Sequence, residues 1–171
     1  ADYETRMRQA CEAVAEDAIP CLDLVLLGLG PDGHTASLFP GHPLLEDTKA
    51  GIAAIEDSPK APSARITFTL PLINAARAVA FIGAGAAKAP ILEQALQLAD
   101  APGAAEAGAP GQLSPNPSSG LPCSLVHPSS GHLKWFVDSE AASTLEPRVR
   151  AASTTAAAHR RVAFMGAMPQ E

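Results

Sequence analysis

The stretch Asp23-Leu-Val-Leu-Leu-Gly-Leu-Gly-Pro-Asp-Gly-His-Thr-Ala-Ser-Leu-Phe-Pro-Gly41 predicts a buried strand followed by a polar loop. The apolar run over 22–27 is long enough for one strand inside a sheet. It is followed by four residues that cannot continue a strand, Gly28, Gly30, Pro31 and Gly33. Residues 35–39 then predict a single helical turn, which ends at Pro40-Gly41.

Asp32 and His34 lie two residues apart in this glycine-rich loop. Open α/β sheets bind ligands beyond the carboxyl ends of their strands, so we expect the loop to form a site. An imidazole with an ordinary pKa near ~6.5 can accept a proton from water at neutral pH, which suits a general base. Asp32 would orient the ring or contact the substrate. The alternative is that His34 only satisfies a backbone carbonyl.

Composition narrows the class of protein. The 171 residues are enough for one domain with a core, and the net charge of -6 argues against a nucleic-acid or anionic-membrane surface, although not against a small anionic ligand. The three cysteines (Cys11, Cys21 and Cys123) form no Cys-x-x-Cys pair, and His127 and His132 are isolated, so we expect neither a disulfide framework nor a metal site. No apolar run is long enough for a transmembrane helix, and no signal peptide is recognisable. We expect a cytoplasmic protein, or a plastid one if a targeting segment lies upstream.

Helices and strands are predicted to alternate along the chain, which indicates an α/β fold. Helices are expected over 1–18, 71–76, 86–99 and 138–145, and further strands over 51–55, 65–70, 78–83 and 133–137. Residues 100–120 are rich in Ala, Gly, Pro and Ser and are expected to form a flexible insert. The tail over 146–171 is expected to be low in complexity or partly helical.

Two other interpretations of the loop are weaker. Gly28, Gly30 and Gly33 match the Gly-x-Gly-x-x-Gly pattern of nucleotide-binding loops. That pattern requires a long helix after the third glycine, whereas Pro40 ends this one after about one turn, and Asp32 would repel a diphosphate. No Gly-x-Ser-x-Gly sequence is present, so an activated-serine hydrolase is not indicated.

The loop closely resembles the signature sequence of the 6-phosphogluconolactonases, within the glucosamine-6-phosphate isomerase/6-phosphogluconolactonase family. The resemblance covers about residues 1–142, with the insert as a gap. Further matching blocks follow in the family's order: Asp57-Ser-Pro-Lys60, Arg65-Ile-Thr-Phe-Thr-Leu-Pro71, Asn74-Ala-Ala-Arg77, Gly85-Ala-Ala-Lys-Ala89, Leu121-Pro-Cys-Ser-Leu-Val-His-Pro128 and Gly131-His-Leu-Lys-Trp-Phe-Val-Asp138. The resemblance implies a Rossmann-like three-layer α/β sandwich with a mostly parallel sheet.

The resemblance also implies a reaction, the hydrolysis of 6-phospho-D-glucono-1,5-lactone to 6-phosphogluconate in the oxidative pentose phosphate pathway, without metal or cofactor. His34 would be the general base that activates water, and Asp32 would orient the site. Gly30 and Gly33 would contact the substrate, and backbone N–H groups of the glycine-rich loop would stabilise the oxyanion.

Two basic residues match positions that this superfamily uses around the sugar phosphate. These are Arg65 and Lys88, for which the alternative is ordinary solvated surface charge. The partner implied is a small sugar-phosphate lactone. The oligomeric state stays open, a monomer included.

The chain departs from the family pattern at its start. The family's N-terminal part, with a Ser-Gly-Gly-Ser-Thr-Pro phosphate loop, has no counterpart here, so residues 1–145 resemble the C-terminal portion of the domain without its first strands. Two alternatives to the lactonase remain: a sugar-phosphate deaminase or isomerase of the same superfamily, and an inactive module that binds a partner. The first is disfavoured because no acid follows His34 before Glu46.

Overall fold

The computed structural model describes residues 2–11, 18–48, 50–98, 113–147 and 149. Its centre is a three-stranded parallel sheet in the order β1-β4-β7, made of β1 (Val25–Gly28), β4 (Val79–Gly83) and β7 (Leu133–Val137). Because parallel strands end at the same edge, the loops that follow these three strands are brought together there. The predicted α/β fold with a parallel sheet is confirmed, and the glycine-rich loop lies at the carboxyl edge of the sheet.

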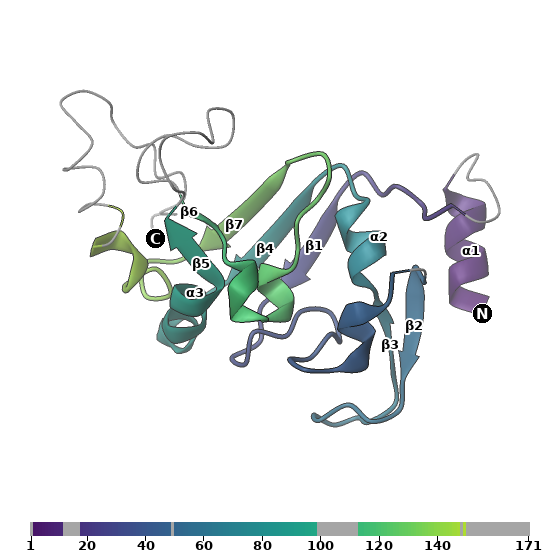
Figure 1. Cartoon of the computed structure of the whole chain (residues 1–171), viewed down its shortest axis with the longest axis horizontal. Helices are drawn as coiled ribbons and strands as arrows, with labels where there is room; N and C mark the ends of the chain where they lie inside the picture. The colour runs from purple at the N-terminus through teal and green to yellow at the C-terminus, as the bar shows by residue number, and fades with distance from the viewer. Residues whose placement is uncertain (1, 12–17, 49, 99–112, 148, 150–171) are drawn as a thin grey trace, which may run out of the picture.

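The other elements are short, and most of them are arranged around this sheet (Figure 1). The helices are α1 (Asp2–Ala10), α2 (Leu70–Asn74) and α3 (Ala89–Ala95), with 3-10 turns η1 (Pro43–Glu46), η2 (Ala86–Lys88), η3 (Pro117–Ser119) and η4 (Pro122–Ser124). Two antiparallel pairs complete the structure, β2 (Ile52–Ile55) with β3 (Arg65–Phe68) and β5 (Leu96–Leu98) with β6 (Leu113–Pro115). No described helix has the length and apolar character to cross a membrane.

One face of the central sheet carries the core. Phe81 in β4 is fully buried and stacks on Trp135 of β7, with ring centroids 4.0 Å apart. Ile73 from α2 and Leu92 from α3 are also fully buried and belong to the same apolar cluster. Pro71 lies in the first turn of α2, where its fixed φ and missing N–H are tolerated. These contacts attach both helices to the sheet.

The opposite face of the sheet is not covered by the described residues. Leu26 of β1, Ile82 of β4 and Phe136 of β7 are 61%, 55% and 50% exposed, and Leu24 is 55% exposed. The strand predicted over 22–27 begins at Val25 in the structure. Its side chains are buried at alternate residues, Val25 and Leu27. Parallel sheets are normally covered on both faces, so this surface is unusually apolar for one in contact with water.

This exposed face should bind an environment-sensitive apolar dye. We expect the double variant Leu26→Ser/Phe136→Ser to lose about half of the fluorescence of bound anilinonaphthalene sulfonate, because two of its large apolar side chains are removed. Ile66→Ser is the matched control, since Ile66 is 59% exposed but lies on β3. Equal fluorescence from the double variant and the original chain would show that the dye does not bind this face.

The strand over 65–68 has an inverted burial pattern. Its alternation of Ile66 and Phe68 with threonines predicts apolar side chains facing the core, yet Ile66 is exposed while Thr67 and Thr69 are buried. The hydroxyl groups explain the inversion. Thr67 Oγ1 accepts a hydrogen bond from Ser37 N at 3.0 Å, and Thr69 Oγ1 donates to the carbonyl of Ala50. Buried hydroxyls are tolerated where they are paired in this way.

The helical turn predicted over 35–39 is a tight turn instead. Leu38 N donates to Thr35 O at 2.8 Å and Thr35 N donates to Leu38 O at 3.3 Å, which closes a narrow two-way bridge. Ala36 has a φ of 50°, which a right-handed helix does not allow. The turn brings Thr35 back toward the strand that precedes the loop.

The helix predicted over 86–99 is divided into three pieces. A 3-10 turn, helix α3 and strand β5 follow one another, and β5 pairs with β6 from within the predicted insert. Asn116 accounts for the early end of α3, because its backbone N donates to Ala95 O and its side-chain amide donates to Gln94 O. Within the insert predicted over 100–120, strand β6 and turn η3 lie in 113–119, and 99–112 lie outside the described residues.

The two ends of the chain differ from the prediction in length. Helix α1 ends at Ala10, and 12–17 of the predicted helix lie outside the described residues. Asp138 does act as the expected cap, since its carboxylate accepts from Ala141 N at 2.8 Å, but regular helix appears only at 145–147 after a series of turns. Apart from 146, 147 and 149, the predicted tail lies outside the described residues.

Candidate active site

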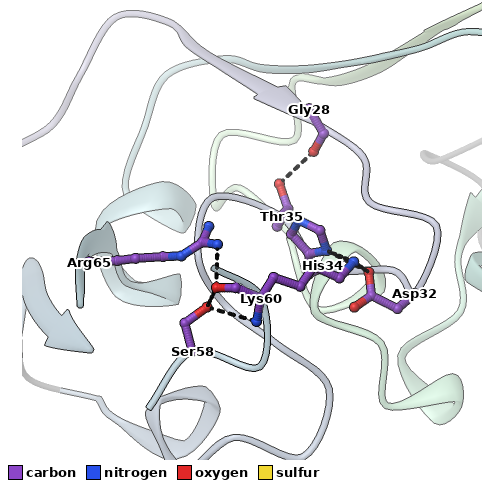
Figure 2. Close-up of polar contacts among 7 residues, drawn as sticks. All are labelled: Gly28, Asp32, His34, Thr35, Ser58, Lys60 and Arg65. Atoms are coloured by element: carbon purple, nitrogen blue, oxygen red, sulfur yellow. Dashed lines mark hydrogen bonds and ion pairs between the residues drawn. The ribbon is translucent and has the colours of Figure 1, made fainter. Parts of the chain in front are cut away.

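The glycine-rich loop after β1 is closed by its own hydrogen bonds. Gly30 N donates to His34 O at 2.9 Å, and Gly33 N donates to Gly30 O at 3.1 Å. Thr35 Oγ1 donates to Gly28 O at 2.9 Å and so joins the end of the loop to the end of the strand (Figure 2). The N–H groups of Gly30 and Gly33 are therefore engaged inside the loop, where they fix its shape.

Gly30 and Gly33 are also required by close packing. A Cβ atom built on Gly30 would lie 2.0 Å from His34 Nδ1 and 2.7 Å from Asp32 Oδ1. Gly33 has a φ of 80°, and a Cβ there would lie 3.0 Å from Leu121. Glycine lets the backbone approach these side chains, and at Gly33 it also allows the left-handed conformation.

Asp32 and His34 form a hydrogen-bonded pair, as the sequence suggested. His34 Nδ1 lies 2.5 Å from Asp32 Oδ1, and the two side chains are 20% and 35% exposed. An ionised carboxylate only accepts hydrogen bonds, so Nδ1 must carry the proton and we assign this tautomer. The lone pair of Nε2 is then available for a proton. This arrangement has the geometry that a general base requires, a ring oriented by a carboxylate.

Lys60 joins this pair from a loop 26 residues further along the chain. Its Nζ lies 3.0 Å from Asp32 Oδ1 and 3.3 Å from His34 Nδ1 (Figure 2). Burial raises the pKa of Asp32, but the hydrogen bonds from His34 and Lys60 outweigh it and lower that pKa to about 2. Asp32 is therefore ionised throughout the physiological range.

The low pKa of Asp32 should make folding depend on pH. A carboxyl group has an ordinary pKa near ~3.9 in an unfolded chain, so the unfolded state binds the proton first as pH falls. The stability that Asp32 contributes is therefore present above pH ~4 and lost toward pH ~2, and after allowance for its 35% exposure we expect about 1 kcal/mol.

Urea unfolding of the chain and of Asp32→Asn would test this dependence. The difference in free energy of unfolding between the two proteins should shrink by roughly half of that amount between pH 6 and pH 3, and by most of it at pH 2. Asp23→Asn is the matched control, because Asp23 pairs only on the surface, with Arg77 at 2.7 Å and 85% exposure. A constant difference across this range would contradict an ionised Asp32 that stabilises the fold.

The imidazole ring rests on an aromatic side chain. The rings of His34 and Phe39 have centroids 4.8 Å apart and are tilted by 32°. Phe39 is 2% exposed, so it is a fixed support, and the guanidinium of Arg65 lies 5.6 Å from the centre of its ring. The ring is thus held by packing as well as by its hydrogen bond to Asp32.

Arg65 binds the loop that carries Lys60. Its Nη2 donates to the carbonyls of Lys60 and Ala61 at 2.7 and 2.9 Å, and its Nε donates to Pro62 O at 2.9 Å. Ser58 Oγ donates to Lys60 O at 2.8 Å from the other side of the same turn. These bonds give Arg65 a positioning role that the sequence did not predict, while its expected contact with a sugar phosphate stays a prediction.

Lys88 lies at the carboxyl edge of the sheet, at the end of η2, which follows β4. A Cβ atom on Gly83 would lie 4.0 Å from Lys88 Cγ and 3.7 Å from the side chain of Leu29. The stem of Lys88 therefore lies beside Gly83, at the end of β4. Its contact with a phosphate stays a prediction.

Cys123 lies directly behind the loop but is not suited to nucleophilic chemistry. Its backbone N donates to Gly33 O at 3.1 Å, and its side chain is fully buried. Burial raises the pKa of its thiol to about 12, whereas the reactive form of cysteine is the thiolate. Cys123 is therefore a packing residue that supports the loop.

The sequence pattern predicted Asp32 and His34 but not Lys60. Lys60 lies within one of the blocks that resemble the family, Asp57-Ser-Pro-Lys60, yet nothing local in that block indicates chemistry. Its approach to Asp32 depends on the pairing of β2 with β3, which sets where the intervening loop lies. The family block was the only signal that could have found it.

A parallel sheet with a histidine–carboxylate pair beyond the carboxyl end of its first strand defines an α/β protein with a ligand site at that edge. Residues 1–135 match the family of glucosamine-6-phosphate isomerases/6-phosphogluconolactonase, and the chain belongs to this family. The resemblance seen in the sequence is thereby confirmed.

Individual relatives agree with the family. The chain is 45% identical over 144 residues to 6-phosphogluconolactonase of Bos taurus, which covers 84% of this chain and 48% of the relative. It is 45% identical over 150 residues to a probable 6-phosphogluconolactonase of Arabidopsis thaliana, covering 85% of this chain and 51% of that protein. The crystal structure of 6-phosphogluconolactonase from Leishmania guyanensis matches with a TM-score of 0.58 at 28% identity, over 82% of this chain and 50% of that one. The chain spans about half the length of the relatives it matches.

Proposed function

We propose that this chain provides the catalytic base for the hydrolysis of 6-phospho-D-glucono-1,5-lactone to 6-phosphogluconate. The observation that supports this function best is the His34–Asp32 pair, which leaves Nε2 of the imidazole as the free proton acceptor. The relatives from Bos taurus and Leishmania guyanensis are named for the same activity.

The proposed reaction begins with a water molecule beside His34 Nε2. The imidazole takes a proton from this water, and the oxygen forms a bond to C1 of the lactone to give a tetrahedral intermediate. The bond between C1 and the ring oxygen then breaks. The imidazolium returns its proton to that oxygen, which becomes a hydroxyl group, and the ring is left as an open-chain carboxylic acid.

Asp32 would act in this sequence as an ionised support for the ring. Its carboxylate holds the Nδ1–H tautomer and stabilises the imidazolium that forms during the reaction. Lys88 and, in a second role, Arg65 would contribute positive charge for the phosphate of the substrate. A deaminase or isomerase is less well supported, because the turn at 35–38 places no carboxylate after His34.

The compartment is proposed from composition and relatives together. We propose a cytoplasmic location, with a plastid as the alternative. A relative from Oryza sativa subsp. indica that is 40% identical is named as chloroplastic.

The direct test is an assay of the purified chain on 6-phosphogluconolactone generated in situ. The assay is run at slightly acidic pH, where spontaneous hydrolysis is slow, and circular dichroism checks that the sample is folded. Loss of lactone faster than the spontaneous background supports the proposal. A folded chain with no activity would overturn it for this chain alone and would favour an incomplete site or a partner-binding module.

A further inference from the structure

We propose that Lys60 is a positioning residue that holds His34 in its neutral form with the proton on Nδ1. Its effect on turnover rests on the proposed function, while its effect on the imidazole can be measured without any turnover. Lys60 Nζ and His34 Nδ1 both lie within hydrogen-bond distance of one oxygen atom, Asp32 Oδ1.

The geometry places a proton on Nδ1 of the imidazole, between the ring and Asp32. The ammonium group of Lys60 has donors and no acceptor, and it lies 3.0 Å from Asp32 Oδ1. His34 Nδ1 lies closer to the same oxygen, at 2.5 Å, and 3.3 Å from Lys60 Nζ. Because the contact with Asp32 is the shorter one, the Nδ1–H group donates to Asp32 Oδ1. The lysine and the imidazole therefore both donate to one carboxylate oxygen.

This arrangement offsets the charge of the carboxylate. A carboxylate beside an imidazole favours the imidazolium, which cannot accept a proton from water. A cation placed 3.3 Å from the same ring favours the neutral form. Lys60 thereby opposes the charge of Asp32 at the ring, while Asp32 still orients it.

The other groups around the ring do not supply this balance. The ring faces Asp32 from its own loop, Lys60 from the following loop and Phe39 beneath it. The guanidinium of Arg65 lies on the ring of Phe39 and is occupied by three carbonyls of the Lys60 loop. Cys123 approaches from behind as an uncharged thiol with a raised pKa. Within the described residues, Lys60 is the cation that contacts the ring.

The loop around Lys60 is built to hold it in place. Ser58 and Arg65 both bond to the carbonyl of Lys60, at 2.8 and 2.7 Å, and Lys60 N donates back to Ser58 Oγ at 3.3 Å (Figure 2). The backbone of Lys60 is thus fixed on two sides. Only its side chain extends toward Asp32, and it is 40% exposed, so its replacement should not disturb the core.

The test uses the long-range ¹H–¹⁵N NMR spectrum of the histidine rings in the purified chain, which distinguishes the two neutral tautomers and follows protonation with pH. The His34 signal is assigned by its absence from His34→Gln. The variants are Lys60→Met, which removes the charge, and Lys60→Arg, which keeps it. Lys134→Met is the matched control, because Lys134 is an exposed lysine on β7.

We expect the original chain to show the Nδ1–H tautomer at neutral pH. In Lys60→Met the midpoint of ring protonation should move upward by about one pH unit. In Lys60→Arg, which keeps the charge, the midpoint should stay close to that of the original chain. Lys134→Met should leave the midpoint unchanged. An unchanged midpoint in Lys60→Met, or an Nε2–H tautomer in the original chain, would overturn the proposal. If Lys60→Met does not fold, Lys60→Gln answers the same question.

Turnover gives a second and separable readout. Where the chain hydrolyses the lactone, Lys60→Met should be about tenfold slower on the acidic limb of the kcat/KM profile and close to the original at high pH, since one pH unit changes the fraction of neutral base about tenfold. A merely structural role would lower both limbs equally, and that result would contradict the proposal. An inactive chain with the expected NMR shift would leave the role of Lys60 supported and the proposed function overturned.

Discussion

Replacing His34 with glutamine is expected to lower lactone hydrolysis by about 10²–10⁴-fold, the usual contribution of a general base. Glutamine can still donate a hydrogen bond to Asp32, so the 2.5 Å contact has a substitute and the loop keeps its shape. What is lost is the lone pair of Nε2. The decrease should therefore appear in kcat, with KM changed much less, because proton transfer is needed only in the transition state.

A second histidine of the chain provides the control for this substitution. His42 also faces a carboxylate, with Nε2 3.2 Å from Asp57 Oδ1, while its Nδ1 accepts from Leu44 N at the start of η1. It lies outside the site, so His42→Gln should retain nearly all activity per folded molecule. Comparable losses from both variants would show that His34 acts only through the fold. Near-full activity in His34→Gln would reject it as the base.

The glycine-rich loop was predictable because its information is local. An apolar run followed by Gly28, Gly30 and Gly33 determines where the strand ends, and parallel topology then places the loop at the ligand-binding edge. Asp32 and His34 are two residues apart in one turn, so their pairing required no knowledge of the rest of the fold. The family resemblance rests largely on this same block.

Features that depend on distant pairing could not be predicted in the same way. Thr67 is buried because Ser37, 30 residues away, donates to its hydroxyl, and the alternation of Ile66 with Thr67 predicts the opposite face. Helix α3 ends early because Asn116 bonds to its last carbonyls across the insert. Lys60 reaches Asp32 across 28 residues. In each case a tertiary hydrogen bond outweighs the local pattern.

The exposure of one face of the central sheet also depends on distant segments of the chain, so it could not be predicted locally. Leu24 and Leu26 have the sequence of a buried parallel strand, and burial on both faces is the ordinary condition of such strands. Whether a second layer is present depends on other segments and not on the strand itself. The apolar run therefore predicted the strand, while the exposure of Leu26 had to be seen in the structure.

Replacing Gly30 with alanine should lower lactone hydrolysis by about 10²-fold while leaving the fold largely intact. The new Cβ would lie 2.0 Å from His34 Nδ1, so the ring must move by more than 1 Å to reach an ordinary contact. That movement breaks the 2.5 Å bond to Asp32, and misplacement of a catalytic group by 1 Å can cost about 10²-fold in rate. Gly30 is not among the described glycines with positive φ, so alanine meets no backbone strain.

Gly28→Ala is the matched control. It is the same substitution two residues earlier, at the last residue of β1, and nothing lies within 4 Å of the new Cβ. The free energy of unfolding of Gly30→Ala, measured in urea, should differ from that of the original chain by at most about 1 kcal/mol. Alanine lowers the conformational entropy of the unfolded chain, and this stabilisation offsets the loss of the contact between His34 and Asp32. The NMR signal of the His34 ring should change in Gly30→Ala and not in Gly28→Ala. If Gly30→Ala keeps both its activity and the Nδ1–H tautomer, the close approach of the backbone to the imidazole is not what orients the base. The orienting role then rests with Asp32, Lys60 and Phe39.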